Sequence, residues 1–333
     1  MSTTGLQKRA RVRAAVEGGM PDRPPVSAWG HFFDRETSAT ALADALVGFH
    51  NHYGWDYFKV HARASYHVEG WGFAYEPARS PTESHVCTSQ PIAEARDWLA
   101  LQPLPLETPA FQEQLALLRL IRDRIGPETP LIMTVFSPLD VAEKLLDRRA
   151  DLLLAYINQH PRELEAALEV MAVTFARFVQ ALVAEGVDGI FFSTKWANHN
   201  KLAADQYQRL VRPFDLYVLE AAKPMWCNML HLCENQVQLD AMADYPVQVF
   251  HWDRSAGDNP ALAAGRDRLG RAVGGGVDAK TLAQGAPGAV EAMALDALQS
   301  TGRRGFLLGP GCSVQMARTP PDNLRALRRA VEA

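Results

Sequence analysis

Short apolar runs alternate along this chain with longer stretches in which apolar residues recur every three or four positions. A short apolar run bounded by turn residues is typical of a buried strand in a parallel sheet, and the longer spacing is typical of an amphipathic helix. The apolar runs predict strands at residues 26–32, 57–61, 131–136, 189–193, 225–233, 247–252, 272–277 and 305–308. The periodic stretches predict helices at 6–17, 39–53, 111–125, 139–158, 161–185, 205–223, 237–242, 260–269, 287–301 and 321–331.

The order of these elements predicts a (β/α)8 TIM barrel, the α/β fold in which eight parallel strands are each followed by a helix. The helix at 6–17 precedes the first strand and is therefore an extra N-terminal helix. Residues 62–109 are rich in aromatic and turn residues and predict a long loop or an inserted hairpin after the second strand. A length of 333 residues suits a single barrel domain with insertions, and no Gly/Ser linker divides the chain.

Composition and charge narrow the classes of partner. Lysine and arginine number 34 against 38 acidic residues, a net charge of −4, which predicts no nucleic-acid or anionic-membrane partner. No run approaches about 18 consecutive apolar residues, and the first residues lack the apolar core of a signal peptide. Four cysteines make no disulfide framework, so we expect a protein of the reducing cytoplasm.

Polar and potential metal-binding side chains gather where the predicted strands end. Active sites of this fold lie at the carboxyl ends of the strands, so these residues are expected to share one face of the barrel. In chain order they are His31, His61, Ser137, Ser193, His231 with Cys233, His251 with Asp253, Asp278 and Cys312. Each residue alone could be a cap or turn residue, but together they indicate a site.

Two of these residues, His231 and Cys233, lie two positions apart in one apolar run. Residues i and i+2 of a strand project from the same face, so the imidazole and the thiol are expected side by side. Zinc binds histidine nitrogen and cysteine sulfur, and catalytic zinc sites use three protein ligands with one open position. Cys312 follows Gly-Pro-Gly at the end of the last strand and is the candidate third ligand. The alternative is that all three are ordinary packing residues of the core.

HLC at 231–233, followed by GPGC at 309–312, is similar to the His-x-Cys…Cys zinc signature of the cobamide-dependent methyltransferases. These enzymes form a branch of the uroporphyrinogen decarboxylase superfamily. Further blocks that resemble the superfamily, in the same order, are RVRAAVEGGMPDRPPV at 11–26, GVDGIFFST at 186–194, GGGVDAKTLAQGAPGAV at 274–290 and CSVQMARTPPDNLRAL at 312–327. The resemblance therefore extends over nearly the whole chain.

This resemblance implies a barrel that holds zinc through His231, Cys233 and Cys312. It implies methyl transfer between a cobamide such as methylcobalamin, or another methylated or methoxylated donor, and a zinc-activated thiol or a pterin such as tetrahydrofolate. The Asp-x-His-x-x-Gly motif of corrinoid-binding domains is absent from the 333 residues. We therefore expect the cobamide to arrive on a separate corrinoid carrier protein or to bind free.

The resemblance does not extend to the porphyrin decarboxylases of the superfamily. Those enzymes carry an arginine-rich segment after the first strand and a closing Gly-His-Gly, whereas this chain has SAWGHFFDRET, with Arg35 alone, and GPGC. A tetra-acid substrate needs several cations because buried carboxylates must be paired. We therefore expect too few basic residues at the barrel mouth for a porphyrin.

Other residues are candidates for supporting roles. Glu234 stands where the family commonly has glycine, and it is a candidate fourth ligand or acid/base group. His31, His251 and Asp253 are the other candidate catalytic residues, and His251 and Asp253 share a strand face that suits support of the metal. The candidate substrate-binding residues are Trp29, His61, His67, Trp196, His199 and Asp278. The tryptophans suit an apolar, ring-binding mouth or ordinary packing.

Two other functions remain open from the sequence. A lyase that decarboxylates a smaller acid on the same barrel would depend on residues such as Asp278 and Arg35 and would not need the three metal ligands. A non-catalytic zinc- or corrinoid-handling protein would have a closed four-ligand site, with Glu234 or Cys227 as the fourth ligand. Substitution of the ligands separates the first alternative from methyl transfer, and the number of protein ligands separates the second.

Overall fold

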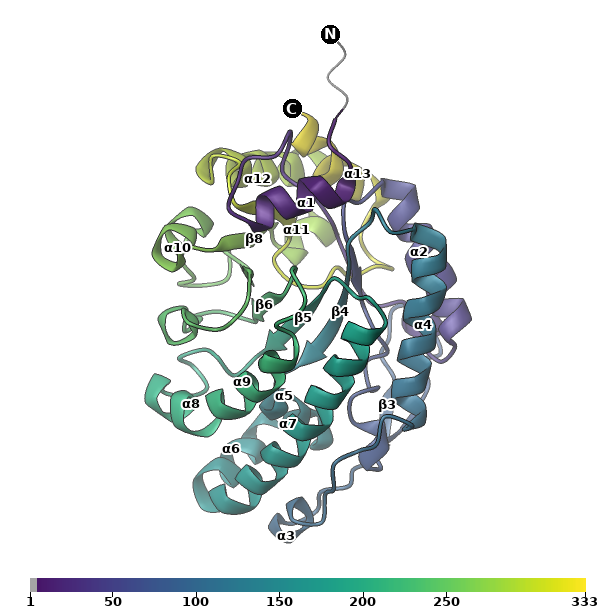
Figure 1. Ribbon diagram of the computed structural model, residues 1–333, viewed down its shortest axis with the longest axis vertical. Coiled ribbons are helices and arrows are strands. Elements are labelled where there is room, and N and C mark those ends of the chain that lie inside the picture. The colour runs from purple at the N-terminus through teal and green to yellow at the C-terminus, as the bar shows by residue number, and fades with distance from the viewer. Residues whose placement is uncertain (1–4) are drawn as a thin grey trace.

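The computed structural model describes residues 5–333, and it shows the predicted α/β barrel (Figure 1). In this part of the chain seven parallel strands form one curled sheet, and spatial neighbours follow one another in sequence. The strands are β1 (Phe58–Val60), β4 (Leu131–Phe136), β5 (Gly189–Thr194), β6 (Met229–Leu232), β7 (Val249–Trp252), β8 (Ala272–Val277) and β9 (Phe306–Pro310). The TIM-barrel class predicted from the sequence is confirmed.

The eighth position of the barrel is taken by a short segment around Val26, in place of the strand predicted at 26–32. Val26 forms an isolated parallel bridge with Leu308 of β9. On its other side, the carbonyl of Val26 accepts the backbone N–H of Asp56, just before β1, at 2.9 Å. Pro25 has no N–H, and the Val26 N–H is taken by the Asp56 carboxylate at 2.9 Å, so neither residue donates to a neighbouring strand. The segment thus joins β9 to β1 and closes the barrel.

Helices surround the sheet, as Figure 1 shows for α4, α7 and α9. The α-helices are α1 (Lys8–Val16), α2 (Ala39–Tyr53), α3 (Ala95–Trp98), α4 (Pro109–Ile125), α5 (Pro138–Leu145), α6 (Ala150–Gln159), α7 (Pro161–Ala184), α8 (Ala204–Leu210), α9 (Arg212–Ala221), α10 (Leu262–Leu269), α11 (Ala279–Gln284), α12 (Pro287–Ser300) and α13 (Pro321–Arg329). The sequence patterns did not predict α11, and the helix predicted at 237–242 is reduced to the 3-10 turn η3 (Asp240–Met242).

Two long predicted helices are broken in the structure. The stretch 139–158 divides into α5 and α6 because Asp147 and Arg148, between them, have positive φ angles of 51° and 63°. The stretch 205–223 divides into α8 and α9 at Pro213, which has no N–H to continue a helix and favours the first turn of the next one. Both breaks are caused by the backbone conformation of single residues, which the spacing of apolar residues does not predict.

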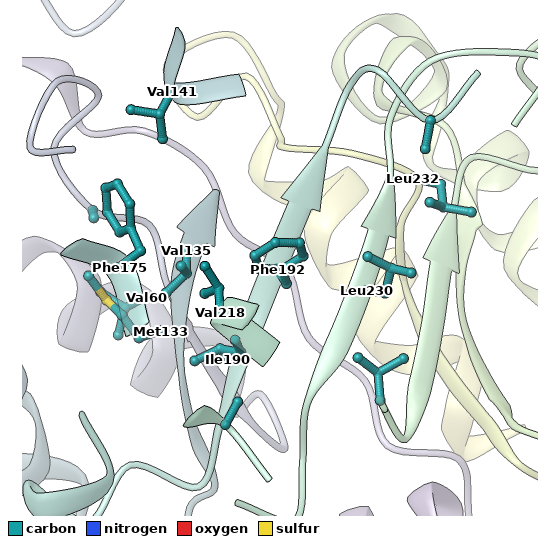
Figure 2. Packing of buried hydrophobic residues seen from close by; sticks show 14 of the residues in the cluster. Val60, Met133, Val135, Val141, Phe175, Ile190, Phe192, Val218, Leu230 and Leu232 are labelled. Carbon is teal, nitrogen blue, oxygen red and sulfur yellow. The ribbon is translucent and has the colours of Figure 1, made fainter. Parts of the chain in front are cut away.

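Alternate residues of each strand face the helices and the barrel interior. Figure 2 shows part of the outward set, where Val135, Phe192 and Leu230 belong to one buried cluster with Phe175 of α7 and Val218 of α9. The strand residues of the interior cluster are Ile132, Phe191, Met229, Val249, Ala272 and Leu307. Inward-facing residues at the carboxyl ends of the strands therefore surround the barrel mouth.

Helix α1 closes the opposite, N-terminal end of the barrel. Its Val12 belongs to the interior cluster. Arg11 donates from Nη1 to Asp56 Oδ1 at 2.8 Å, and Arg9 donates from Nη2 to Asp188 Oδ2 at 3.1 Å. These ion pairs hold the helix across the strand starts, so a pocket in the barrel opens at the carboxyl end.

The section at 62–109, for which the sequence predicts a long loop or an inserted hairpin, contains a hairpin. Strand β2 (Ala74–Glu76) pairs antiparallel with β3 (Val86–Ser89), and α3 follows. The second predicted strand, 57–61, corresponds to β1, and the insertion predicted after it is therefore confirmed. It supplies His67 and Ser84 to the wall of the main pocket.

Helix α7 is, among residues 5–333, the one helix long and apolar enough to cross a membrane by length and composition alone. In the structure it is a core helix, since Leu168, Phe175 and Phe178 are fully buried. It packs against α5 and α9 in the shell of the barrel.

Candidate functional site

His231, Cys233 and Cys312 come together at the carboxyl ends of β6 and β9. One ligand atom from each residue lies within 4.8 Å of the other two. His231 is buried near the end of β6, and Cys233 follows the strand, where its N–H donates to the carbonyl of Thr194 at 3.0 Å. Zinc bonds to nitrogen and sulfur are about 2.0–2.3 Å long, so small side-chain movements bring these atoms onto one ion.

A tight turn after β9 presents Cys312. The N–H of Gly311 donates to the carbonyl of Val277, at the end of β8, at 2.8 Å. A Cβ atom on Gly311 would lie 2.5 Å from Cγ of Asp253 and 2.8 Å from its Cα. Glycine is therefore needed at this position, because the turn approaches the end of β7 more closely than a side chain allows.

A hydrogen-bonded chain fixes the proton on His231. Burial, and the neighbouring His231, hold the pKa of His251 well below its usual value, so the His251 ring is neutral. Its Nε2–H donates to the carbonyl of Pro310 at 2.9 Å, because a carbonyl only accepts. Nδ1 of His251 is then an acceptor, and it takes the Nδ1–H of His231 at 2.8 Å. Nε2 of His231 keeps a free lone pair, which is the form that a zinc ligand requires.

The two thiols act as a pair. The hydrogen bond from Cys233 holds the pKa of the Cys312 thiol well below its usual value. That same hydrogen bond and burial raise the pKa of Cys233. One sulfur is therefore already disposed to be a thiolate, the form in which cysteine binds metals.

The three residues open into a pocket of about 400 Å³. Of the residues singled out from the sequence, its wall also includes Trp29, His31, His61 and His67. The rings of His31 and His61 are 3.9 Å apart between centroids, and His31 contacts Glu36. His67 is buried, its Nδ1 has no hydrogen-bond partner among the described residues, and burial holds its pKa well below the usual value. The pocket therefore combines a soft ligand set with several imidazoles.

Other residues singled out from the sequence lie outside this wall: Trp196, His199, Glu234, Asp253 and Asp278. Glu234 has a φ of 70° and is exposed, and its carboxylate pairs with Lys201 at 3.0 Å. Trp196 is buried and donates from Nε1 to Glu143 at 3.3 Å, whereas His199 is exposed. The left-handed turn after Cys233 thus carries Glu234 away from the three ligand atoms.

The two aspartates have local structural partners. Asp253 accepts the N–H of Ser255 at 2.8 Å, and burial raises its pKa. Asp278 is the N-cap of α11 and accepts the N–H of Thr281 at 2.8 Å. Both line a separate, more open pocket beside the main one. His251 lies behind His231 and is fully buried.

The sequence reasoning missed the basic residues of the main pocket, which are Lys59, Lys144, Arg148 and Lys195. The expectation that the mouth has few cations is therefore wrong. Lys195 pairs with Glu143 at 2.9 Å, but Lys59 and Lys144 are buried beside histidines. Burial lowers the pKa of Lys59 to about 7 and that of Lys144 to about 8. A signal for Lys59 existed, because it lies two residues before His61 and so faces the interior with it.

The family model of uroporphyrinogen decarboxylase (URO-D) matches residues 7–333. The chain belongs to this family. Among curated proteins, the methylcobamide:CoM methyltransferase MtaA of Methanosarcina barkeri is 23% identical over 245 residues, which cover 72% of this chain and 69% of that protein. The family resemblance read from the sequence blocks is thus confirmed, on the methyltransferase side of the URO-D superfamily.

Solved structures agree on the fold. A methyltransferase from Methanosarcina mazei superimposes with a TM-score of 0.85 at 20% identity, and the match covers 98% of both chains. A B12-independent methionine synthase from Shewanella sp. W3-18-1 has a TM-score of 0.58 at 14% identity, covering 93% of this chain and 96% of that one. At these identities the structural likeness establishes the barrel alone.

Proposed function

We propose that this URO-D family member is a zinc-dependent methyltransferase that moves a methyl group between a cobamide and an acceptor, either a thiol or a pterin. The observation that carries the proposal is the convergence of His231, Cys233 and Cys312 at the mouth of the barrel. The activity named for the M. barkeri relative supports the same reaction class. The chain would thus belong to the corrinoid-linked part of the family.

The donor set fits zinc by its chemistry. His231 offers an unprotonated Nε2, and the two cysteines offer a thiolate and a thiol that a cation readily deprotonates. When bound, zinc keeps a coordinated thiol deprotonated and therefore nucleophilic. Glu234 pairs with Lys201, so the protein supplies three ligands here and leaves a position for the acceptor. His251 orients His231, and Trp29 gives part of the pocket wall an apolar surface.

The size of the pocket indicates which of the two substrates binds inside it. A volume of about 400 Å³ suits a small acceptor, whereas a cobamide is far larger and must present its methyl group at the mouth. A second groove continues outward from Phe33 and Ser313 along Met316 and Arg318. A separate corrinoid carrier protein, or free cobamide, would approach over this rim.

Methyl transfer is tested with zinc-loaded protein, methylcobalamin and a series of thiols and reduced pterins. The absorbance of the corrinoid reports loss of its methyl group, and mass spectrometry identifies the methylated product. We expect turnover with at least one acceptor class and none with Cys312→Ser. Absence of turnover with every acceptor, and with methylated donors in the reverse direction, would reject the proposal.

Decarboxylation of a small acid is the second candidate, favoured by the cations Lys59, Lys144 and Arg148 in the pocket wall. Such cations suit a carboxylate substrate. This reaction needs no soft metal ligands, so it predicts that Cys312→Ser retains activity while Lys144→Met loses it. Methyl transfer predicts that Cys312→Ser is inactive.

A further inference from the structure

Lys59 is a buried cation at the floor of the main pocket. It is in β1, its side chain faces the barrel interior, and only 4% of the residue is exposed. Nζ lies 4.5 Å from the ring centroid of Phe191 and 5.6 Å from that of Trp29. Within residues 5–333 its one side-chain hydrogen bond joins Nζ to Nδ1 of His61 at 2.7 Å. Lys59 therefore reaches the same space as the three ligand atoms.

Within residues 5–333 no carboxylate pairs with this ammonium at 4.0 Å or less, whereas Lys195 in the same pocket pairs with Glu143. His61 is buried and neutral, so it accepts one of the three N–H bonds of Lys59. Two N–H bonds are left for a ligand. An unpaired buried charge destabilises a fold, and such groups are concentrated at functional sites.

The charges at the mouth indicate what that ligand is. Two cysteine thiolates would neutralise a bound zinc dication, so a third thiolate from the substrate would give the centre one net negative charge. In a buried site that charge needs a cation. Lys59 is close enough to Cys312 for the cysteine's charge to act on it.

We propose that Lys59 is a substrate-binding residue that donates a hydrogen bond to an anionic acceptor sulfur, and that the acceptor is therefore a thiol. This inference rests on the zinc methyltransferase function proposed above. On binding, the S–H bond of the acceptor would break, its proton would leave to solvent, and its sulfur would become a ligand of the zinc held by His231, Cys233 and Cys312. Lys59 would keep its own proton. A pterin nitrogen is neutral when it accepts a methyl group, and it gains nothing from a neighbouring ammonium.

The variants Lys59→Met and Lys144→Met test this assignment, because each removes one positive charge from the pocket wall. Zinc content, thermal midpoint and thiol affinity are measured on the zinc-loaded proteins, with affinity and proton release taken from calorimetry using 2-mercaptoethanol. We expect Lys59→Met to bind zinc normally and to unfold at the same or a higher temperature. Its thiol affinity should fall roughly 10- to 100-fold, as when one partner of a buried charge pair is removed. Lys144→Met should lose less than about threefold.

A purely structural role for Lys59 would instead lower the thermal midpoint and leave thiol affinity unchanged. That result overturns the proposal, as does an equal loss in Lys144→Met or failure of the wild type to bind any thiol. The assay contains no cobamide, so it tests the role of Lys59 in thiol binding separately from the proposed methyl transfer. Thiol binding that depends on Lys59, in a protein without methyl transfer, would reject the proposed function and keep the role of Lys59.

Discussion

His231 and His251 are register partners on the neighbouring strands β6 and β7, and their Nδ1 atoms are hydrogen-bonded at 2.8 Å. The next partner in the register, on β8, is Gly274, where an added Cβ would lie 3.1 Å from Cδ2 of His251. Glycine thus leaves room for the His251 ring, and Pro310 on β9 accepts its Nε2–H. The proton position on His231 is therefore set by strand register.

Replacing His251 with phenylalanine should weaken zinc binding about 10- to 100-fold, because partners that orient a metal-binding histidine contribute that much. Phenylalanine keeps an aromatic ring at this buried position, so the barrel should remain folded. Competition with a chromogenic chelator measures the zinc affinity. His67→Phe is the matched control, since His67 is a buried pocket histidine that does not contact His231 in the described structure, and its zinc affinity should equal that of the wild type. Equal affinities in both variants would contradict the orienting role.

Gly311→Ala should destabilise the protein by about 1–3 kcal/mol, as overpacking does, because its Cβ would lie 2.8 Å from the backbone of Asp253. Displacing the turn also moves Cys312, so zinc affinity should fall as well. Gly288→Ala is the control, because nothing lies within 4 Å of its Cβ. Urea unfolding should show that this control is neutral or more stable by up to about 1 kcal/mol. Equal effects of the two substitutions would reject the steric argument.

Asp215 predicts a pH dependence of stability. It is fully buried and accepts hydrogen bonds from Ser137, Tyr207 and Tyr245 at 2.7, 2.6 and 3.0 Å. Burial raises its pKa from 3.8 to about 6. A raised carboxyl pKa favours the folded state below pH 3.8, and this contribution is lost as the pH rises through 6.

The Asp215 contribution amounts to about 3 kcal/mol for a shift of roughly two units. It is isolated as the difference in unfolding free energy between the wild type and Asp215→Asn, measured by urea unfolding at several pH values from about 4 to 8. As the pH rises, the unfolding free energy of the wild type should fall relative to that of Asp215→Asn. A difference independent of pH, or one that moves in favour of the wild type, would contradict the raised pKa.

The order of apolar runs was sufficient to predict the barrel, since buried parallel strands and amphipathic helices differ in period and length. The first strand was overestimated, since the predicted segment makes only isolated bridges at Val26 and Gly30, and the Val26 N–H is taken by the Asp56 carboxylate. Asp56 is far from Val26 in sequence, so the pattern of apolar residues cannot predict this contact. The breaks at Arg148 and Pro213 arise from single backbone positions.

For the site, the same-face rule placed His231 beside Cys233, and strand ends placed Cys312 at the same mouth. This rule predicts which face of a strand a residue occupies, but it does not predict the direction of the chain in the turn after the strand. Glu234 follows Cys233 directly, yet its positive φ sends it to Lys201. The pocket cations were missed because polar residues were sought at strand ends, whereas Lys59 lies within β1.

The zinc content of the purified protein, measured beside Cys312→Ser, is the sharpest test of the proposed three-ligand site. We expect about one zinc per wild-type chain, a strong loss in the variant, and a folded barrel in both, because a catalytic zinc is not what holds so large a core together. A well-folded wild type that takes up no zinc even after supplementation would contradict it. The cysteines would then be packing residues, and decarboxylation would become the leading function.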